Sequence, residues 1–188
     1  MCGRYTLYDT LKSKLYSHID IEPNYNVCPS SKVLIINNKM EIEYGLWSMK
    51  SSWSDQINII NARSESLDTK NMFKNTERCI LIANGYFEWK KMSSGKIPYY
   101  HTYSNNMMYF GGVKNTSGIC IVTRNSYKNI SYIHHRQPVI LGYEDFEKWF
   151  QKKHDYSSEV SKNIITYKVS NTVNKPINNS IKNIEKVL

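Results

Sequence analysis

The residue most clearly suited to chemical reaction is Cys2, which directly follows Met1. Methionine aminopeptidase removes Met1 when the second residue is small, so we expect the mature chain to begin with this cysteine. Such a residue carries a thiol and an α-amine on adjacent carbons, and the amine has an ordinary pKa of about 7.7–8.0. The pair can capture an aldehyde as an imine, which the thiol then closes to a thiazolidine; the thiol alone can serve an amidase as nucleophile. A cysteine at position 2 is by itself weak evidence, so its meaning depends on the rest of the chain.

The other cysteines do not indicate a metal site. Cys28, Cys79 and Cys120 are widely spaced and form no C-x-x-C or C…H-x-x-x-H pattern, so we predict no metal and no cofactor. Cys79 and Cys120 lie in apolar, strand-like runs and are predicted to be small core residues. Without a secretory signal the chain is also not expected to form disulfides.

Three further segments place polar residues in mostly apolar surroundings: Ile60–Glu65 (INARSE), Ala83–Trp89 (ANGYFEW) and Ile133–Val139 (IHHRQPV). Together with the start of the chain, MCGRY, they resemble the SRAP family, the SOS-response-associated peptidases. Five further matches follow in the same order along the chain: Tyr25–Pro29, Tyr44–Leu46 with Trp53 after it, Lys96–Tyr100, Ile121–Thr123 and Val169–Asn174. No single motif is decisive, but the ordered set is specific.

The family is known for crosslinking to abasic sites in single-stranded DNA, and the resemblance implies the same partner here. It implies a SRAP fold over residues 2–175 and a site built from Cys2, Asn61, Glu88 and His134. The family pattern H-[D/N]-R-M-P selects His134 over its neighbour. His135 and Gln137 depart from that pattern, which puts the local hydrogen bonding in doubt without removing the histidine.

Physical roles can be argued for the site residues. Opening the hemiacetal of an abasic sugar is acid–base work, and an apolar surrounding would raise the pKa of Glu88 and suit it to move protons. The alternative is a surface carboxylate on the polar face of a strand. His134 can exchange protons or donate to the sugar or phosphate, or it can simply cap a backbone carbonyl. Asn61 can orient the amine or thiol of Cys2, or be a turn residue.

Residues for holding the strand are expected nearby. The guanidinium groups of Arg4 and Arg63 suit phosphate oxygens, although a structural ion pair, with Glu65 as a candidate partner of Arg63, is the alternative. The remaining candidates are Thr123 as a weaker donor, Trp53 as a stacking platform in a Ser/Lys-rich loop, and Pro29 as a wedge against a base. By contrast, Arg136 is expected to hold the His134 loop, and Trp89 and Trp149 are expected in the core.

The elements that must position these residues are mostly strands. Runs rich in Ile, Val, Tyr and Phe are separated by Asn, Ser, Gly and Pro, and predict strands at 32–36, 41–46, 79–82, 85–89, 99–103, 107–113, 118–123, 139–141 and 165–169. Helices are predicted at 10–17, 64–75 and 143–152. Because strands outnumber helices without alternating with them, we predict an α+β fold. Its mostly antiparallel, barrel-like core carries a few flanking helices. One domain, 2–175, is expected, with a tail at 176–188 that is either packed on the domain or loose.

Charge supports a polyanionic partner only weakly. The chain has 25 Lys+Arg against 16 Asp+Glu, a net charge of +9, and residues 95–188 hold 13 basic and 6 acidic groups. Either nucleic acid binding or AT-rich codons explains this excess. The apolar runs are too short for a membrane, so we predict an intracellular, unsecreted monomer that binds single-stranded DNA. Three functions remain open: an abasic-site crosslinking protein, a cysteine peptidase or amidase with an N-terminal nucleophile, and a non-catalytic nucleic-acid-binding module.

Overall fold

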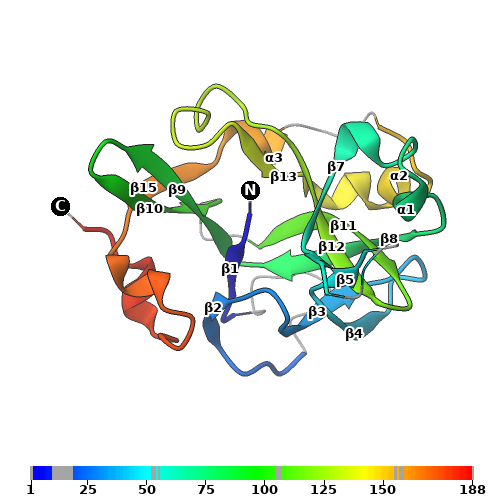
Figure 1. The fold of residues 1–188 in the computed structure, drawn as a ribbon, viewed down its shortest axis with the longest axis horizontal. Coiled ribbons are helices and arrows are strands. Elements are labelled where there is room, and N and C mark those ends of the chain that lie inside the picture. The colour runs from blue at the N-terminus through cyan, green and yellow to red at the C-terminus, as the bar shows by residue number, and fades with distance from the viewer. Residues whose placement is uncertain are drawn as a thin grey trace.

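The computed structural model describes residues 2–9, 19–51, 54, 56–104, 107–154, 156 and 159–187. Two mostly antiparallel sheets form the body of the molecule (Figure 1). The smaller one has five strands in the order β15 (Ile165–Lys168), β10 (Gly95–Thr102), β9 (Gly85–Met92), β1 (Arg4–Leu7) and β2 (Asn24–Val27). This sheet carries the start of the chain and the segment that contains Glu88.

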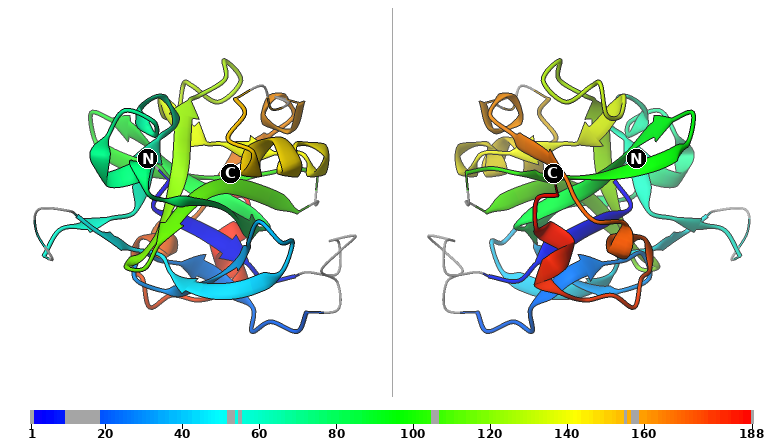
Figure 2. Two further views of the ribbon diagram at one scale, coloured as in Figure 1. Left: turned by 90° about the vertical axis from the view of Figure 1, so that its right-hand side faces the viewer. Right: turned by 90° about the vertical axis from the view of Figure 1, so that its left-hand side faces the viewer.

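The larger sheet has eight strands. Its main path runs β13 (Arg136–Pro138), β12 (Gly118–Asn125), β11 (Met108–Asn115), β8 (Glu77–Ala83), β3 (Lys32–Ile36) and β4 (Ile42–Leu46). Two short strands join it at the side: β14 (Ile140–Leu141) pairs with β11, and β7 (Asn61–Arg63) runs parallel to β12. A separate pair, β5 (Met49–Lys50) and β6 (Asn58–Ile59), extends from the body as a narrow arm (Figure 2).

The predicted α+β class and the mostly antiparallel pairing are confirmed. The sheets are nevertheless not closed into a barrel. Among the described strands, β15 and β2 at the ends of one sheet and β13 and β4 at the ends of the other each pair with a single neighbour. The core is therefore two open sheets packed together rather than one continuous cylinder.

The chain passes from the larger sheet to the smaller one at Asn84, between β8 and β9. The side chain of Asn84 fixes this crossing: its Oδ1 accepts from the backbone N–H groups of Tyr8 (2.7 Å) and Asp9 (3.1 Å), and its Nδ2 donates to the carbonyl of Asp9 (2.8 Å). The main apolar core lies between the two sheets and includes Tyr86 of β9. The opposite face of β9 buries Phe87 in a second cluster, so this strand is apolar on both sides.

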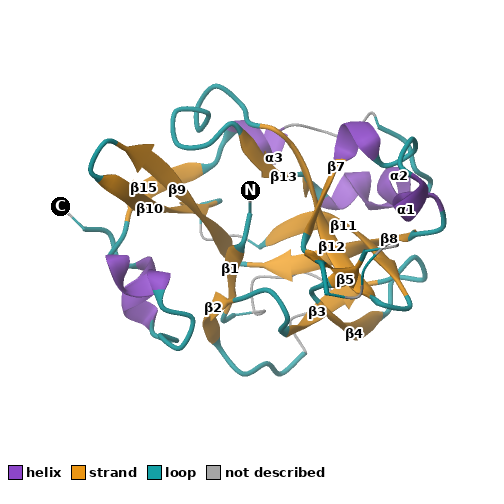
Figure 3. Ribbon diagram, viewed as in Figure 1, coloured by secondary structure: helices purple, strands orange, loops and turns teal. Residues whose placement is uncertain are grey.

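Helices are short and lie at the periphery (Figure 3). The described ones are the 3-10 helices η1 (Ser64–Ser66), η2 (Tyr143–Asp145), η3 (Asn171–Asn174) and η4 (Ile181–Ile184), and the α-helices α1 (Asn71–Lys74), α2 (Phe146–Phe150) and α3 (Glu159–Lys162). All of them are too short and too polar to traverse a lipid bilayer. The helix predicted at 64–75 is two separate turns, because its Ser, Asp, Thr and Asn side chains compete for backbone hydrogen bonds. The helix predicted at 10–17 lies outside the described residues.

The C-terminal segment packs against the five-stranded sheet, on the side where Phe87 is buried. Val173 belongs to the same apolar cluster as Phe87, and Lys186 forms an isolated β-bridge with Val169, the residue after β15. Asn183 is fully buried. The predicted boundary at residue 175 stays a prediction, while residues 176–187 lie against the sheet in this structure.

The backbone at Gly118 accepts no side chain, so its substitution should measurably lower stability. Gly118 has φ of 147°, and a Cβ there would lie 2.0 Å from the carbonyl oxygen of Ser48. Gly118→Ala is expected to lower the free energy of unfolding by about 2–4 kcal/mol, because backbone strain and a steric clash add together. Gly95 is the matched control: its φ is 131°, but a Cβ would meet nothing within 4 Å. Gly95→Ala should therefore cost only the strain, about 1–2 kcal/mol. Urea denaturation of both variants checks this, and equal losses would contradict it.

Candidate active site

The candidate site lies where β1 ends beside β9. These strands pair from Thr6 opposite Gly85 only as far as Arg4 opposite Phe87, so β9 continues past the end of β1. Cys2 lies just before β1 and is fully buried. Glu88 is the first residue of β9 beyond the paired stretch. The strand pairing thus brings the start of the chain to the segment of β9 that carries the carboxylate.

Asn61 fixes the backbone of Cys2. It is the first residue of β7, which pairs in parallel with β12 and is thereby held at the site. Its Nδ2 donates to the carbonyl of Cys2 at 2.9 Å, while its buried Oδ1 has no hydrogen-bond partner among the described residues. An unused buried acceptor beside the first residues of the chain is suited to receive an N–H of the Cys2 amine.

Glu88 and His134 come together from opposite parts of the chain. Oε1 of Glu88 lies 3.8 Å from Nδ1 of His134, and Glu88 is only 3% exposed. Burial raises the pKa of Glu88 to about 7, which brings a carboxyl group to half-ionisation near neutral pH. Burial lowers the pKa of His134, so its imidazole is neutral at that pH. Nδ1 of His134 lies 3.0 Å from the backbone nitrogen of Arg136 and 3.1 Å from the carbonyl oxygen of the same residue.

The thiol of Cys2 is protonated at rest. Burial raises its pKa, and the nearby carboxylate of Glu88 raises it further. A resident thiolate of the kind found in cysteine proteases is therefore disfavoured. The thiol needs a proton acceptor at the moment of reaction, and a carboxyl group with a pKa near 7 is a suitable one.

Arg136 supports the His134 loop, as expected from the sequence. Its buried guanidinium forms a bidentate pair with Glu65 at 2.5 and 3.0 Å and donates to the carbonyl of Thr123 at 2.7 Å. This ion pair lowers the pKa of Glu65 to about 2. Glu65 is thus paired with Arg136, and not with Arg63, for which it was one candidate partner in the ion-pair alternative. The hydroxyl of Thr123 is buried and donates to the carbonyl of Ala62 at 3.3 Å.

The other predicted DNA contacts lie in different settings. Arg4 holds the C-terminal segment: Nη1 donates to Asn26 Oδ1 (2.9 Å) and to the carbonyl of Val173 (2.6 Å). Arg63 is exposed and Pro29 is half-buried in the turn after β2. Trp53 lies outside the described residues. The DNA-binding roles of all these residues, and of Thr123, stay predictions.

A cleft of about 590 Å³ opens beside the site, lined by Glu88, Trp89, Lys91, Lys96, His134 and Asn174. Trp149 is buried in the core as predicted, but Trp89 is half-buried and lines this cleft. Its indole N–H donates to Asn174 Oδ1 at 2.7 Å. Alternation along β9 predicts a core residue, whereas the tertiary structure leaves the indole in the lining of this cleft. Asn174 ends the matched segment Val169–Asn174, but it was not among the predicted site residues.

Known proteins resemble this chain over almost its whole length. The family model described as SOS response associated peptidase (SRAP) matches residues 1–184. Abasic site processing protein YoqW of Bacillus subtilis is 32% identical, covering 98% of this chain and 99% of its own. Abasic site processing protein YedK of Escherichia coli is 28% identical, covering 81% of each.

Solved structures share the fold. A crystal structure of a protein from Bacteroides thetaiotaomicron superimposes with a TM-score of 0.78 at 22% identity and covers all of both chains. This likeness agrees with the two open sheets described above. Because the family model covers nearly every residue, the chain belongs to the SOS response associated peptidase (SRAP) family.

Proposed function

We propose that this protein processes abasic sites in single-stranded DNA by forming a covalent thiazolidine crosslink through Cys2. The observation that carries the proposal is the grouping of Cys2 with Asn61, Glu88 and His134, residues drawn from four separate segments. The names of the relatives YoqW and YedK, abasic site processing proteins, support the same substrate. The +9 net charge is consistent with a nucleic acid partner.

The first stage is capture of the aldehyde by the amine. Removal of Met1 frees the α-amine of Cys2, whose neutral form attacks the aldehyde carbon of the ring-opened sugar. The resulting carbinolamine loses one water and becomes an imine. Glu88 and His134 exchange the protons that ring opening and water loss require, since the pKa of Glu88 is about 7 and the imidazole is neutral.

The second stage closes the ring. The Cys2 sulfur bonds to the imine carbon, its proton passes by way of Glu88 to the former imine nitrogen, and no further atom leaves. The overall reaction joins protein and DNA with the loss of one water. The raised pKa of the thiol fits this order, because the thiol loses its proton only when the imine is in place to accept it.

The strand itself would be held by residues around the site. We assign phosphate contacts to Arg4, Arg63 and Thr123, and base contacts to Trp53 and Pro29. The protein is expected to act as an intracellular monomer, with residues 2–175 as the functional domain.

The direct test is to incubate the purified protein with a single-stranded oligonucleotide that carries one abasic site. A band that resists heat and denaturant on a gel is expected, and the same oligonucleotide without the abasic site should give none. A wild-type protein of verified fold that yields no such band would overturn the proposal.

A peptidase is the second candidate, because a thiol, an imidazole and a carboxylate lie in one place. The buried, protonated thiol argues against it. Cleavage of a peptide panel in trans by the wild type, lost in His134→Ala, would favour this function over crosslinking.

A further inference from the structure

The part of β9 beyond β1 carries an unusual pair of lysines. Lys91 of β9 lies directly opposite Lys96 of β10, so their side chains are on the same face of the hairpin. Like charges in this cross-strand position destabilise a hairpin. Both side chains are exposed, and among the described residues neither ammonium group has a carboxylate partner.

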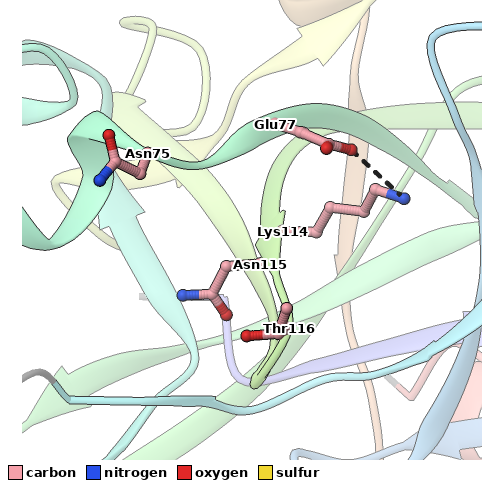
Figure 4. Close-up of a pocket in the computed structure, with 5 residues that line it drawn as sticks. All are labelled: Asn75, Glu77, Lys114, Asn115 and Thr116. Carbon is pink, nitrogen blue, oxygen red and sulfur yellow. Dashed lines mark ion pairs between the residues drawn. The ribbon is translucent and has the colours of Figure 1, made fainter.

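Another lysine of the protein has its charge neutralised by neighbouring carboxylates. Lys114 of β11 lies between Glu43 and Glu77, and its Nζ is 3.7 Å from the carboxylate of Glu77 (Figure 4). That hollow, lined also by Asn75, Asn115 and Thr116, has its positive charge neutralised by the protein itself. The charges of Lys91 and Lys96 are left for something outside the chain to neutralise.

Their position links them to the candidate active site. Lys91, Lys96, Trp89 and Glu88 line the same cleft, which lies along the edge of β9 that β1 leaves uncovered. Lys91 is three residues beyond Glu88, roughly 10 Å along an extended strand, and its side chain leaves the opposite face of β9. The cleft that both residues line therefore passes around the free edge of this strand. A polymer that presents its reacting group to Glu88 therefore passes the lysines with a neighbouring unit.

The walls of the cleft are held in place. Asn174 of the C-terminal segment fixes the indole of Trp89, as described above. Outside the cleft lining, Nζ of Lys90 lies 5.0 Å from the ring centre of Tyr132 and joins the hairpin to the loop that carries His134. An aromatic surface next to two uncompensated cations is the usual combination for single-stranded nucleic acid.

We propose that Lys91 and Lys96 form a phosphate-binding site for the backbone of the DNA single strand, at a nucleotide adjacent to the one that reacts. This inference rests on the proposed function and adds a path for the strand, along the free edge of β9. The lysines recognise phosphate charge and not base identity, so their contribution is independent of sequence and sensitive to salt.

The test uses binding alone. The double variant Lys91→Gln/Lys96→Gln and the wild type are titrated with an undamaged single-stranded oligonucleotide at several salt concentrations. Two lost phosphate contacts should reduce the slope of log affinity against log salt by about 1.4, which amounts to a roughly tenfold loss of affinity at 0.15 M salt. Both side chains are exposed and their like charges repel, so the variant should unfold at the same temperature as the wild type or slightly higher.

The matched control is Lys152→Gln/Lys153→Gln, which makes the same change in charge after α2, on the other side of the molecule (Figure 1). It should leave affinity and slope nearly unchanged. Equal losses in the two double variants would show that only net charge matters and would overturn the proposal, as would a Lys91/Lys96 variant that binds like the wild type.

Failure of the crosslinking function would look different. A wild type that binds the strand with the predicted lysine dependence, yet forms no adduct with an abasic site, would refute the crosslink and leave the phosphate site standing. If the adduct forms normally but the loss of both lysines leaves binding unchanged, the phosphate site is refuted and the crosslink stands.

Discussion

Cys2→Ala is expected to abolish the heat-stable adduct with an abasic single strand completely. Alanine is as suitable as cysteine for removal of Met1, so the variant keeps the α-amine and can still form an imine. It lacks the sulfur that closes the ring, and an imine hydrolyses on heating. The adduct should therefore appear only when borohydride reduces the imine before denaturation.

Cys28→Ala is the control for this experiment. Cys28 is a half-buried free thiol in the turn after β2, with its Sγ 3.0 Å from the carbonyl oxygen of Asn26. Its loss removes a free thiol outside the candidate site and leaves the start of the chain unchanged. Normal adduct yield is expected. A Cys2→Ala variant that forms the heat-stable adduct as fast as the wild type would refute the role of the sulfur.

Glu88→Gln is expected to slow adduct formation by roughly 10²–10⁴-fold, the usual contribution of a positioned acid–base group. The wild-type rate should show an inflection near pH 7, because burial raises the pKa of Glu88 to about 7. The protonated form, which donates to the sugar oxygen, is lost as the pH rises through that value. In the variant this inflection should vanish while the titration of the α-amine remains.

Stability separates a chemical role from a structural one. The folded state holds the proton of Glu88 more tightly than the unfolded state, so the contribution of Glu88 to stability falls as the pH rises from about 4.5 to about 7. Glu88→Gln should therefore be at least as stable as the wild type at pH 8, while being far slower. Glu77→Gln, on the exposed end of β8, should change neither rate nor profile. An unaltered rate in Glu88→Gln would contradict the assignment.

The sequence predicted the strands of five or more residues and missed several shorter, polar ones. β3 coincides with the predicted 32–36 because four of its five residues are buried. β1, β2, β7 and β13 escaped prediction, since they are only three or four residues long and rich in polar side chains. Their pairing depends on partners distant in the chain, which local patterns do not encode.

The candidate site likewise combines residues that the sequence predicted with surroundings that it did not. Cys2, Asn61, Glu88 and His134 were all chosen from motifs, and the structure brings them to one place. The surroundings followed from tertiary structure alone. Arg4 binds backbone carbonyls of a segment about 170 positions away, and Trp89 is half-buried in a cleft that Asn174 and His134 also line. The local sequence around Arg4 and Trp89 predicts neither of these contacts.

The most direct test of the central claim is the intact mass of the adduct, followed by digestion to locate the bond. The expected mass is that of the chain without Met1 plus the abasic oligonucleotide minus one water, with the DNA remnant on the peptide that begins at Cys2. An adduct that retains Met1, or one attached at any other residue, would contradict thiazolidine formation at Cys2.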